Sequence, residues 1–337
     1  MRPYIWLAVA ACGTAARVAP PSETGAPTGR LADGSSVTLA LAGDRVGGVS
    51  PAGSNASAWL WPPIVDSHVH LAYWPVGEQL AASGVGVAID LAAPERTLGS
   101  REPLDVIEAG PMLTRPNGYP LDSWGSDGFG IGCADEACVK STIDRLVAAG
   151  ARVIKLAGDD DGLAPALIPA AVAAAHAHRL KVAIHALSNA SALAAARAGV
   201  DVLAHTPVEP LDDATVQAWK GRAVISTLAA FGGSASAVQN LAKLRAAGAT
   251  VLYGTDLGNT RDAGPSADEV KLLRDAGLDD SAICDAMTTA PLAFWGIAAG
   301  PSVGREATFT VLDGDPRRDA SVLLHPRAIY VRGKRLR

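Results

Sequence analysis

The chain has few aromatic and few charged residues. Phe, Trp and Tyr make up 5% of the 337 residues and charged residues 19%, whereas hydrophobic residues make up 49%. The formal net charge is -5 without any block of like charge, which gives no reason to expect a nucleic acid as partner. Packing must therefore rely on Ala, Val and Leu, and the apolar content suffices for a sizeable core.

Long apolar runs are also missing, since a bilayer span takes about 20 apolar residues. The N-terminus reads "MRPYIWLAVAAC", in which Arg2 precedes a short apolar stretch and Cys12 follows small residues. This order is typical of a secretory signal, and "VAAC" resembles a bacterial lipobox. We predict a lipoprotein-type signal over residues 1–12 and a flexible tether over 13–29. The protein would then be exported to the cell envelope, in the periplasm or at the outer membrane, and attached only by a lipid on Cys12. A disordered cytoplasmic N-terminus is the alternative.

Three further cysteines complete the set of four. Cys133 and Cys138 flank "ADEA", and in an oxidising compartment they could form a local disulfide, with two unpaired thiols as the alternative. Cys284, within "SAICDAM", is expected to be a buried helix residue.

From residue 64 onward, short apolar segments alternate with Ala-rich helical patterns. Strands are expected at residues 64–71, 84–91, 104–110, 151–157, 181–187, 201–206, 222–228 and 250–257, with helices at 137–149, 164–179, 189–198 and 235–247. This alternation predicts an α/β fold with a parallel sheet, and eight strands predict a (β/α)₈ TIM barrel over residues 63–299. A doubly wound open sheet is the alternative, although no G-x-G-x-x-G follows these strands. The flanks, 30–62 and 300–337, show β-type alternation and predict a small β-domain that both ends of the chain build together.

Polar residues recur at the carboxyl ends of the expected strands, where barrel enzymes carry their chemistry. His68 and His70, in "VDSHVH", are two residues apart, so on a strand both imidazoles project to one side. The full set is His68, His70, Lys155, His185, His205 and Asp256. Each could be explained singly, as a satisfied core histidine or a helix cap, but their shared position predicts a metal site. By contrast His176 and His178 fall in a helical pattern and are expected on its surface.

With these residues in view, the sequence resembles the amidohydrolase superfamily, in the branch related to imidazolonepropionase and Xaa-Pro dipeptidases. The motifs are "VDSHVHL", "GPMLTRPNGYP", "ARVIKLAGDDDG", "KVAIHA", "DVLAHT" and "YGTDLGN", in the family's order. The approach to the first strand, "WPPIVD", and the return "GPSVGREATFTVLDGDP" depart from the family pattern within the expected β-domain.

The resemblance implies a site for two divalent metal ions, with Zn²⁺ the expected metal. His68, His70 and Asp256 would hold the more buried ion, His185 and His205 the second, and carbamylated Lys155 would bridge both. A bridging hydroxide would attack the substrate, with Asp256 and His205 as the candidate catalytic residues, and Asp256 would pass the proton to the leaving nitrogen.

The expected function is therefore that of a metal-dependent amidohydrolase, which cleaves a C–N bond in an amide, a cyclic amide or a small peptide. A small molecule or dipeptide would be the substrate, while the oligomeric state is open. One alternative is a mononuclear deaminase, although "ALSNAS" after His185 lacks the Glu that such enzymes carry. The other is a non-catalytic, lipid-anchored binding protein. The loops 114–132 and 229–237 are expected to shape the pocket, where Tyr119 and Trp124 would pack the loop or contact substrate.

We expect Cys12→Ser to release the protein from the membrane fraction or leave its precursor unprocessed, because the lipid is attached to this thiol. Fractionation and intact mass measured in the native host check this. An unmodified Met1 in the mature protein would contradict the predicted signal.

Overall fold

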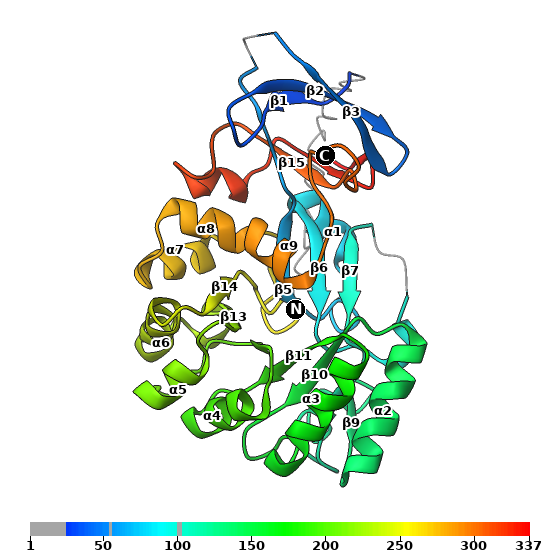
Figure 1. Cartoon of the computed structure of the whole chain (residues 1–337), viewed down its shortest axis with the longest axis vertical. Coiled ribbons are helices and arrows are strands. Elements are labelled where there is room, and N and C mark those ends of the chain that lie inside the picture. The colour runs from blue at the N-terminus through cyan, green and yellow to red at the C-terminus, as the bar shows by residue number, and fades with distance from the viewer. Residues whose placement is uncertain (1–24, 54–55, 100–102) are drawn as a thin grey trace, which may run out of the picture.

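The chain is a mixed α/β protein with a β-sheet at one end and helices around parallel strands at the other (Figure 1). The computed structural model describes residues 25–53, 56–99 and 103–337. The predicted signal over 1–12, with Cys12, and most of the tether over 13–29 therefore lie outside the described residues. Strand β1 (Thr28–Arg30) begins within the last residues assigned to the tether.

Parallel strands lie in all of the segments predicted to be strands between residues 64 and 257. They are β5 (Ile64–Val69), β6 (Val85–Asp90), β7 (Asp105–Glu108), β10 (Val153–Ala157), β11 (Lys181–His185), β12 (Val202–Leu203), β13 (Ala223–Ile225) and β14 (Thr250–Leu252). Neighbouring strands pair in parallel, in the sheet β5-β6-β7 and in the sheet β14-β13-β12-β11-β10-β8-β9. The predicted α/β class with parallel sheets is thus confirmed.

These strands are divided between two sheets, whereas the sequence predicted one closed sheet. The division falls at β10, whose two ends have different neighbours. At its start, Arg152 N–H donates to the Glu108 carbonyl beside β7, at 2.9 Å. Further along, Leu156 pairs with Leu113 of β8 (Met112–Thr114), a strand that the sequence did not predict. Strand β9 (Gly130–Gly132) extends the sheet beyond β8.

Helices follow most of these strands and form the outer layer of the molecule (Figure 1). The four predicted helices correspond to α2 (Glu136–Ala149), α3 (Ile168–Ala177), α4 (Asn189–Ala198) and α6 (Ala235–Ala246). Side chains of Asp135, Ser188 and Ser234 accept N–H hydrogen bonds that begin α2, α4 and α6. The sequence analysis did not identify α1 (Gly77–Ser83), α5 (Asp213–Ala218), α7 (Ala267–Asp275), α8 (Asp280–Met287) and α9 (Thr289–Trp295). Short 3₁₀ turns are η1 (Glu95–Thr97), η2 (Pro165–Leu167), η3 (Ala229–Phe231) and η4 (Ala320–Leu324).

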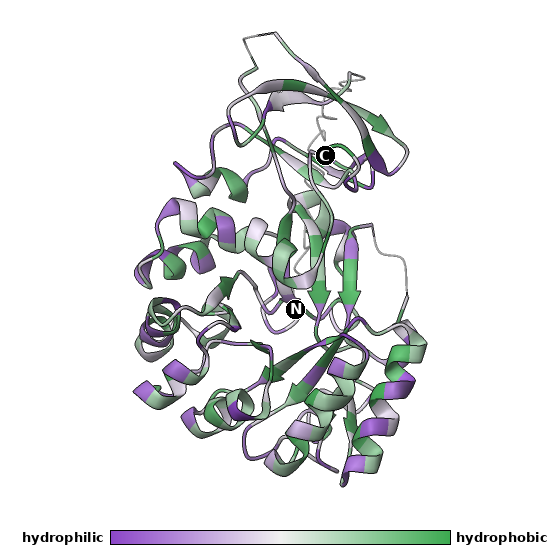
Figure 2. Cartoon of the chain, viewed as in Figure 1, coloured by the Kyte–Doolittle hydropathy of each residue, from purple (hydrophilic) through white to green (hydrophobic). Residues whose placement is uncertain are grey.

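Small apolar side chains fill the space between the parallel strands. One buried cluster takes a residue from each of them, namely Val65, Val87, Ile107, Val153, Ala183, Val202, Ala223 and Leu252. Phe294 and Trp295 of α9 pack against this cluster. A larger cluster joins the other faces of the strands to the helices, and in Figure 2 the strands are mostly hydrophobic while hydrophilic residues mark the outer turns of α2 and α3. The core therefore matches a composition rich in Ala, Val and Leu.

The two flanks of the chain meet in a separate sheet of order β17-β16-β15-β4-β1-β2-β3 (Figure 1). Its strands are β1, β2 (Ser36–Ala42), β3 (Arg45–Pro51), β4 (Trp59–Trp61), β15 (Phe309–Leu312), β16 (Ala328–Val331) and β17 (Lys334–Arg335). Strand β4 joins the halves, because it pairs with β1 on one side and with β15 on the other. Phe309 and Tyr330 stack in its core with ring centroids 4.7 Å apart.

Cys133 and Cys138 form a disulfide at the start of α2, which is one of the two alternatives that the sequence left open. Cys284 is a free, buried cysteine of α8, as expected. Among the helices that the structure describes, none is long and apolar enough to cross a membrane.

We expect Gly333→Ala to destabilise the protein more than Gly34→Ala. Both glycines have positive φ, +76° and +84°, so both substitutions carry the backbone strain of an L residue, about 1–2 kcal/mol. A Cβ on Gly333 would in addition overlap the carbonyl oxygen of Gly43, whereas one on Gly34 meets nothing within 4 Å. Urea denaturation of both variants measures the difference, and equal losses would contradict the proposed backbone contact.

Candidate metal centre

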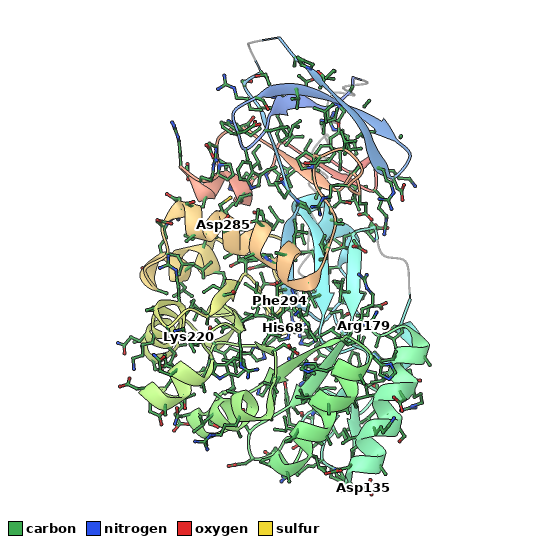
Figure 3. The ribbon with its side chains drawn as sticks, in the orientation of Figure 1. His68, Asp135, Arg179, Lys220, Asp285 and Phe294 are labelled. Atoms are coloured by element: carbon green, nitrogen blue, oxygen red, sulfur yellow. A yellow bond between two sulfur atoms is a disulfide. The ribbon has the colours of Figure 1, made fainter. Side chains whose placement is uncertain are left out.

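All six residues predicted for the site line one cavity of about 450 Å³. They come from β5, β10, β11 and the segments that follow β5, β12 and β14, and His68 lies in the middle of the helix-covered part of the molecule (Figure 3). His205 and Asp256 lie beyond the ends of β12 and β14, so the regular strands are shorter than the sequence suggested.

His68, His70 and Asp256 form the most compact part of the site. Their ligand atoms all lie within 4.8 Å of one another, and this buried group could hold a metal ion. The Nε2 atoms of the two histidines are 3.2 Å apart. Asp256 Oδ1 lies 3.2 Å from His70 Nε2 and 3.5 Å from His68 Nε2. The two-residue spacing in "VDSHVH" thus brings both imidazoles to the same carboxylate, as the alternation of a strand requires.

Hydrogen bonds from the other ring nitrogen orient two of the histidines. His68 Nδ1 lies 2.9 Å from the carbonyl oxygen of Ala204, and His205 Nδ1 lies 3.1 Å from the hydroxyl of Thr227. These contacts leave the Nε2 atoms as the nitrogens available to a ligand, as is usual for histidines that bind metal.

The segment after β14 approaches β5 very closely. Asp66 accepts hydrogen bonds from the backbone N–H and the hydroxyl of Thr255, at 3.0 and 2.5 Å. A Cβ on Gly258 would lie 2.8 Å from the Cβ of His70, so this position needs glycine. Asp256 adopts a positive φ of 54° between them, which ends the strand and turns its carboxylate toward the histidines.

Lys155 is the most unusual residue of the site, because it is only 1% exposed and its Nζ has no hydrogen-bond partner among the described residues. Burial lowers the pKa of this amine to about 7, while the charge of Asp256 opposes the shift. A buried lysine without a partner is costly, which indicates that the side chain has a further role.

The same burial keeps His68, His185 and His205 neutral. It holds the pKa of His68 and His205 well below the usual range and, together with the charge of Lys155, lowers that of His185 to about 4. Burial would raise the pKa of Asp256, but the neighbouring His68, His70 and Lys155 outweigh it and hold that pKa below its usual range. Neutral imidazoles and an ionised carboxylate are the forms that bind a divalent cation. The residues present therefore fit a metal ion.

Aromatic rings cover the histidines on the cavity side. Trp124 lies 5.3 Å from the ring of His70, Tyr119 lies 5.0 Å from that of His185, and Phe231 lies 4.8 Å from that of His205. Trp124 also donates a hydrogen bond to the Tyr119 hydroxyl at 3.2 Å. Tyr119 and Trp124 thus pack the loop and line the cavity at once, which combines the two roles considered from sequence.

Other residues near the cavity were missed in the sequence. Met112, Leu187 and Arg261 line it, and Thr227 supports His205. The carboxylate of Asp159 accepts hydrogen bonds from the backbone N–H groups of Leu187 and Ser188, in the turn after β11. One of its oxygens lies 3.9 Å from His185 Nε2. None of these residue types is distinctive in sequence, because their roles depend on how loops fold back over the strands.

The second H-x-H pair lies away from the cavity, as predicted. His176 pairs with Asp201 at 2.9 Å and His178 with Asp144 at 2.7 Å, and both are at least partly exposed.

Comparison of the sequence with known proteins finds relatives but no family. No family model matches the chain. Uncharacterized proteins of Mycobacterium tuberculosis and Mycobacterium bovis are 26% identical over 356 residues, covering 90% of this chain and 93% of theirs.

Solved structures are similar at lower sequence identity. A Xaa-Pro dipeptidase with bound methionine in its active site has a TM-score of 0.73 at 15% identity, covering 88% of this chain and 94% of that chain. A prolidase complexed with N-methylphosphonate-L-proline has 0.71 at 18%, covering 91% and 97%. A bottromycin amidohydrolase has 0.71 at 19%, covering 89% and 82%. The resemblance to the amidohydrolase superfamily is thus confirmed at the level of the fold.

We expect Asp256→Asn to reduce uptake of divalent metal while the fold is kept, because the amide has the same shape but no charge. Metal per chain after dialysis, with circular dichroism, checks this. Asp268→Asn, on an exposed carboxylate of α7, is the matched control. Full metal content in Asp256→Asn would mean that this carboxylate is not a ligand.

Proposed function

We propose that the chain is a metal-dependent hydrolase that cleaves a C–N bond in an amide, a cyclic amide or a small peptide. The observation that carries this proposal is a group of buried polar atoms without hydrogen-bond partners, in the described residues, around one cavity. They are His70 Nδ1, Lys155 Nζ and Asp256 Oδ1. Such atoms cost free energy unless something else satisfies them, and divalent cations would satisfy a set rich in imidazole and carboxylate.

Two ions would share the six side chains. His68, His70 and Asp256 would hold one and His185 and His205 the other. Lys155 would join both as a carbamate, since an ammonium cannot bind a cation. Zn²⁺ suits these donors best, although Mn²⁺, Co²⁺ or Fe²⁺ also accept them. When bound, the ions would activate a water molecule as nucleophile and polarise the scissile carbonyl.

The protein's own side chains would then guide the reaction. Asp256 is positioned to accept a proton from the attacking water as the new C–O bond forms. The same carboxyl would deliver that proton to the nitrogen as the C–N bond breaks. His205, whose Nδ1 lies 3.1 Å from the Thr227 hydroxyl, would keep its second ring nitrogen for the second ion. Phe231 and Trp124 limit access of bulk water.

We also infer that the parallel strands close into a TIM barrel. Backbone hydrogen bonds support this, from Ser67 N–H to Tyr253 and from His70 N–H to Leu257, at 2.9 and 2.7 Å. The bond from Arg152 to Glu108 supports it at the other division between the sheets. The cluster that takes one side chain from each strand is the interior that a barrel needs.

A small molecule or dipeptide is the proposed substrate. Support comes from two structural neighbours, one bound to methionine and one to a proline phosphonate. Export and a lipid anchor at Cys12 remain proposals as well. The disulfide between Cys133 and Cys138 supports an oxidising compartment.

Counting metal ions in the native protein separates this proposal from its alternatives. Two ions per chain are expected, together with hydrolysis of at least one member of a set of dipeptides, lactams and N-acyl amino acids. One ion would favour a mononuclear deaminase. No ion would favour a non-catalytic binding protein.

We expect Lys155→Ala to lose bound metal and turnover together, because the substitution removes the only ligand that both ions share. Elemental analysis and hydrolysis rates are measured on the same sample, and a mass increase at Lys155 in the native parent would detect the carbamate. Lys220→Ala, on an exposed lysine, is the control. Added acetate or propionate should restore part of the activity of Lys155→Ala. Two ions and normal turnover in Lys155→Ala would contradict the bridging role.

A further inference from the structure

We propose that Arg261 binds a carboxylate of the substrate, so that the cavity selects amides with a free carboxylate on one side and an apolar group on the other. This inference rests on the proposed function, because it names the class of molecule that the hydrolase accepts. It follows from the position of Arg261, from its stacking and from the character of the cavity wall.

Arg261 lies on the wall of the cavity that contains the candidate metal ligands. The turn that carries it is attached to Asp256: Thr260 N–H donates to the Asp256 carbonyl at 3.0 Å, and Asn259 Nδ2 donates to the Asp256 carboxylate at 3.2 Å. The Thr260 hydroxyl also donates to the Thr255 carbonyl at 3.1 Å. These bonds hold the backbone of the turn that carries Arg261 next to Asp256.

The guanidinium group lies against aromatic rings, and no described residue accepts a hydrogen bond from it. Its central carbon lies 4.3 Å from the ring centroid of Trp74 and 5.6 Å from that of Tyr73. Stacking uses the flat face of the guanidinium, whereas a carboxylate binds at its edge through paired N–H donors. Within the described residues, Arg261 forms no ion pair with an acidic side chain. A substrate carboxylate would therefore meet a guanidinium group that no acidic side chain of the described residues occupies.

Charge along the cavity wall favours the same conclusion. Among the described residues that line the cavity, Lys155 is the one lysine and Arg261 the one arginine. Lys155 is buried, whereas Arg261 is exposed. An anionic group that enters the cavity thus meets Arg261 as its cationic partner at the exposed side.

The remaining wall is largely apolar, which indicates the other half of the substrate. Met112, Trp124, Leu187 and Phe231 contribute to it. An N-acyl amino acid or dipeptide with an apolar or aromatic side chain would match this wall while its carboxylate reaches Arg261.

Binding of a matched pair of probes to the metal-loaded, full-length protein tests the inference. The pair is N-acetyl-L-phenylalanine and its uncharged C-terminal amide, each titrated by calorimetry, with the tryptophan emission of the protein as a second readout. We expect the acid to bind at least tenfold more tightly than the amide. Arg261→Gln should weaken binding of the acid roughly 10- to 100-fold and leave that of the amide unchanged. Arg197→Gln, on an exposed arginine of α4, should change neither.

The inference is overturned if the parent binds acid and amide equally, if neither probe binds, or if Arg261→Gln leaves the preference for the acid intact. The last result would mean that the metal ions, and not Arg261, hold the carboxylate. Hydrolysis of both probes is measured separately. Selective, Arg261-dependent binding without hydrolysis of any amide would refute the proposed function and support the carboxylate site. Equal hydrolysis of both probes, insensitive to Arg261→Gln, would refute the carboxylate site alone.

Discussion

The burial of ionisable side chains inside the parallel strands is the constraint on which the rest of the structure depends. Lys155 and His68 have almost no contact with solvent, and the carboxylate of Asp256 is nearly as buried. A protein interior tolerates such groups only if they satisfy one another or a bound ion. The surroundings serve that need: hydrogen bonds orient the imidazoles, glycine lets two chain segments touch, and aromatic rings pack against the histidines.

Support for the site comes from backbone as much as from side chains. The carbonyl of Ala204 orients His68, and the hydroxyl of Thr227 orients His205. Glu269, buried in α7, accepts the N–H groups of Leu228 and Ala229 and so holds the turn that places Phe231 beside His205. Burial raises the pKa of Glu269 to about 7, although these hydrogen bonds oppose the shift. The carboxylate of Glu269 thus connects helix α7 to the turn that carries Phe231, a residue of the cavity wall.

Much of this could be predicted from the sequence, because strand periodicity is local. Alternation within "VDSHVH" placed two imidazoles on one side, and apolar segments at regular spacing located the parallel strands. The division of the sheets at β10 could not be predicted, since β8 and β9 are short: β8 pairs beside Leu156, and β9 forms where the 114–132 loop returns beside β8. Arg261 and Thr227 were missed for a related reason: an ordinary residue gains its role only from tertiary neighbours. The helices α7–α9 are only 9, 8 and 7 residues long, and helices this short give little sequence signal.

The contact between Asp66 and Thr255 joins residues 189 positions apart in the chain. The same meeting of β5 with the segment after β14 brings His68 and His70 to Asp256. Such distant partners are entropically expensive to bring together and tend to meet late in folding. During synthesis, His68 and His70 are therefore made well before Asp256, whose carboxylate completes the group. Only after residue 256 has been made can the group close, so the proposed uptake of metal would have to follow synthesis of that segment.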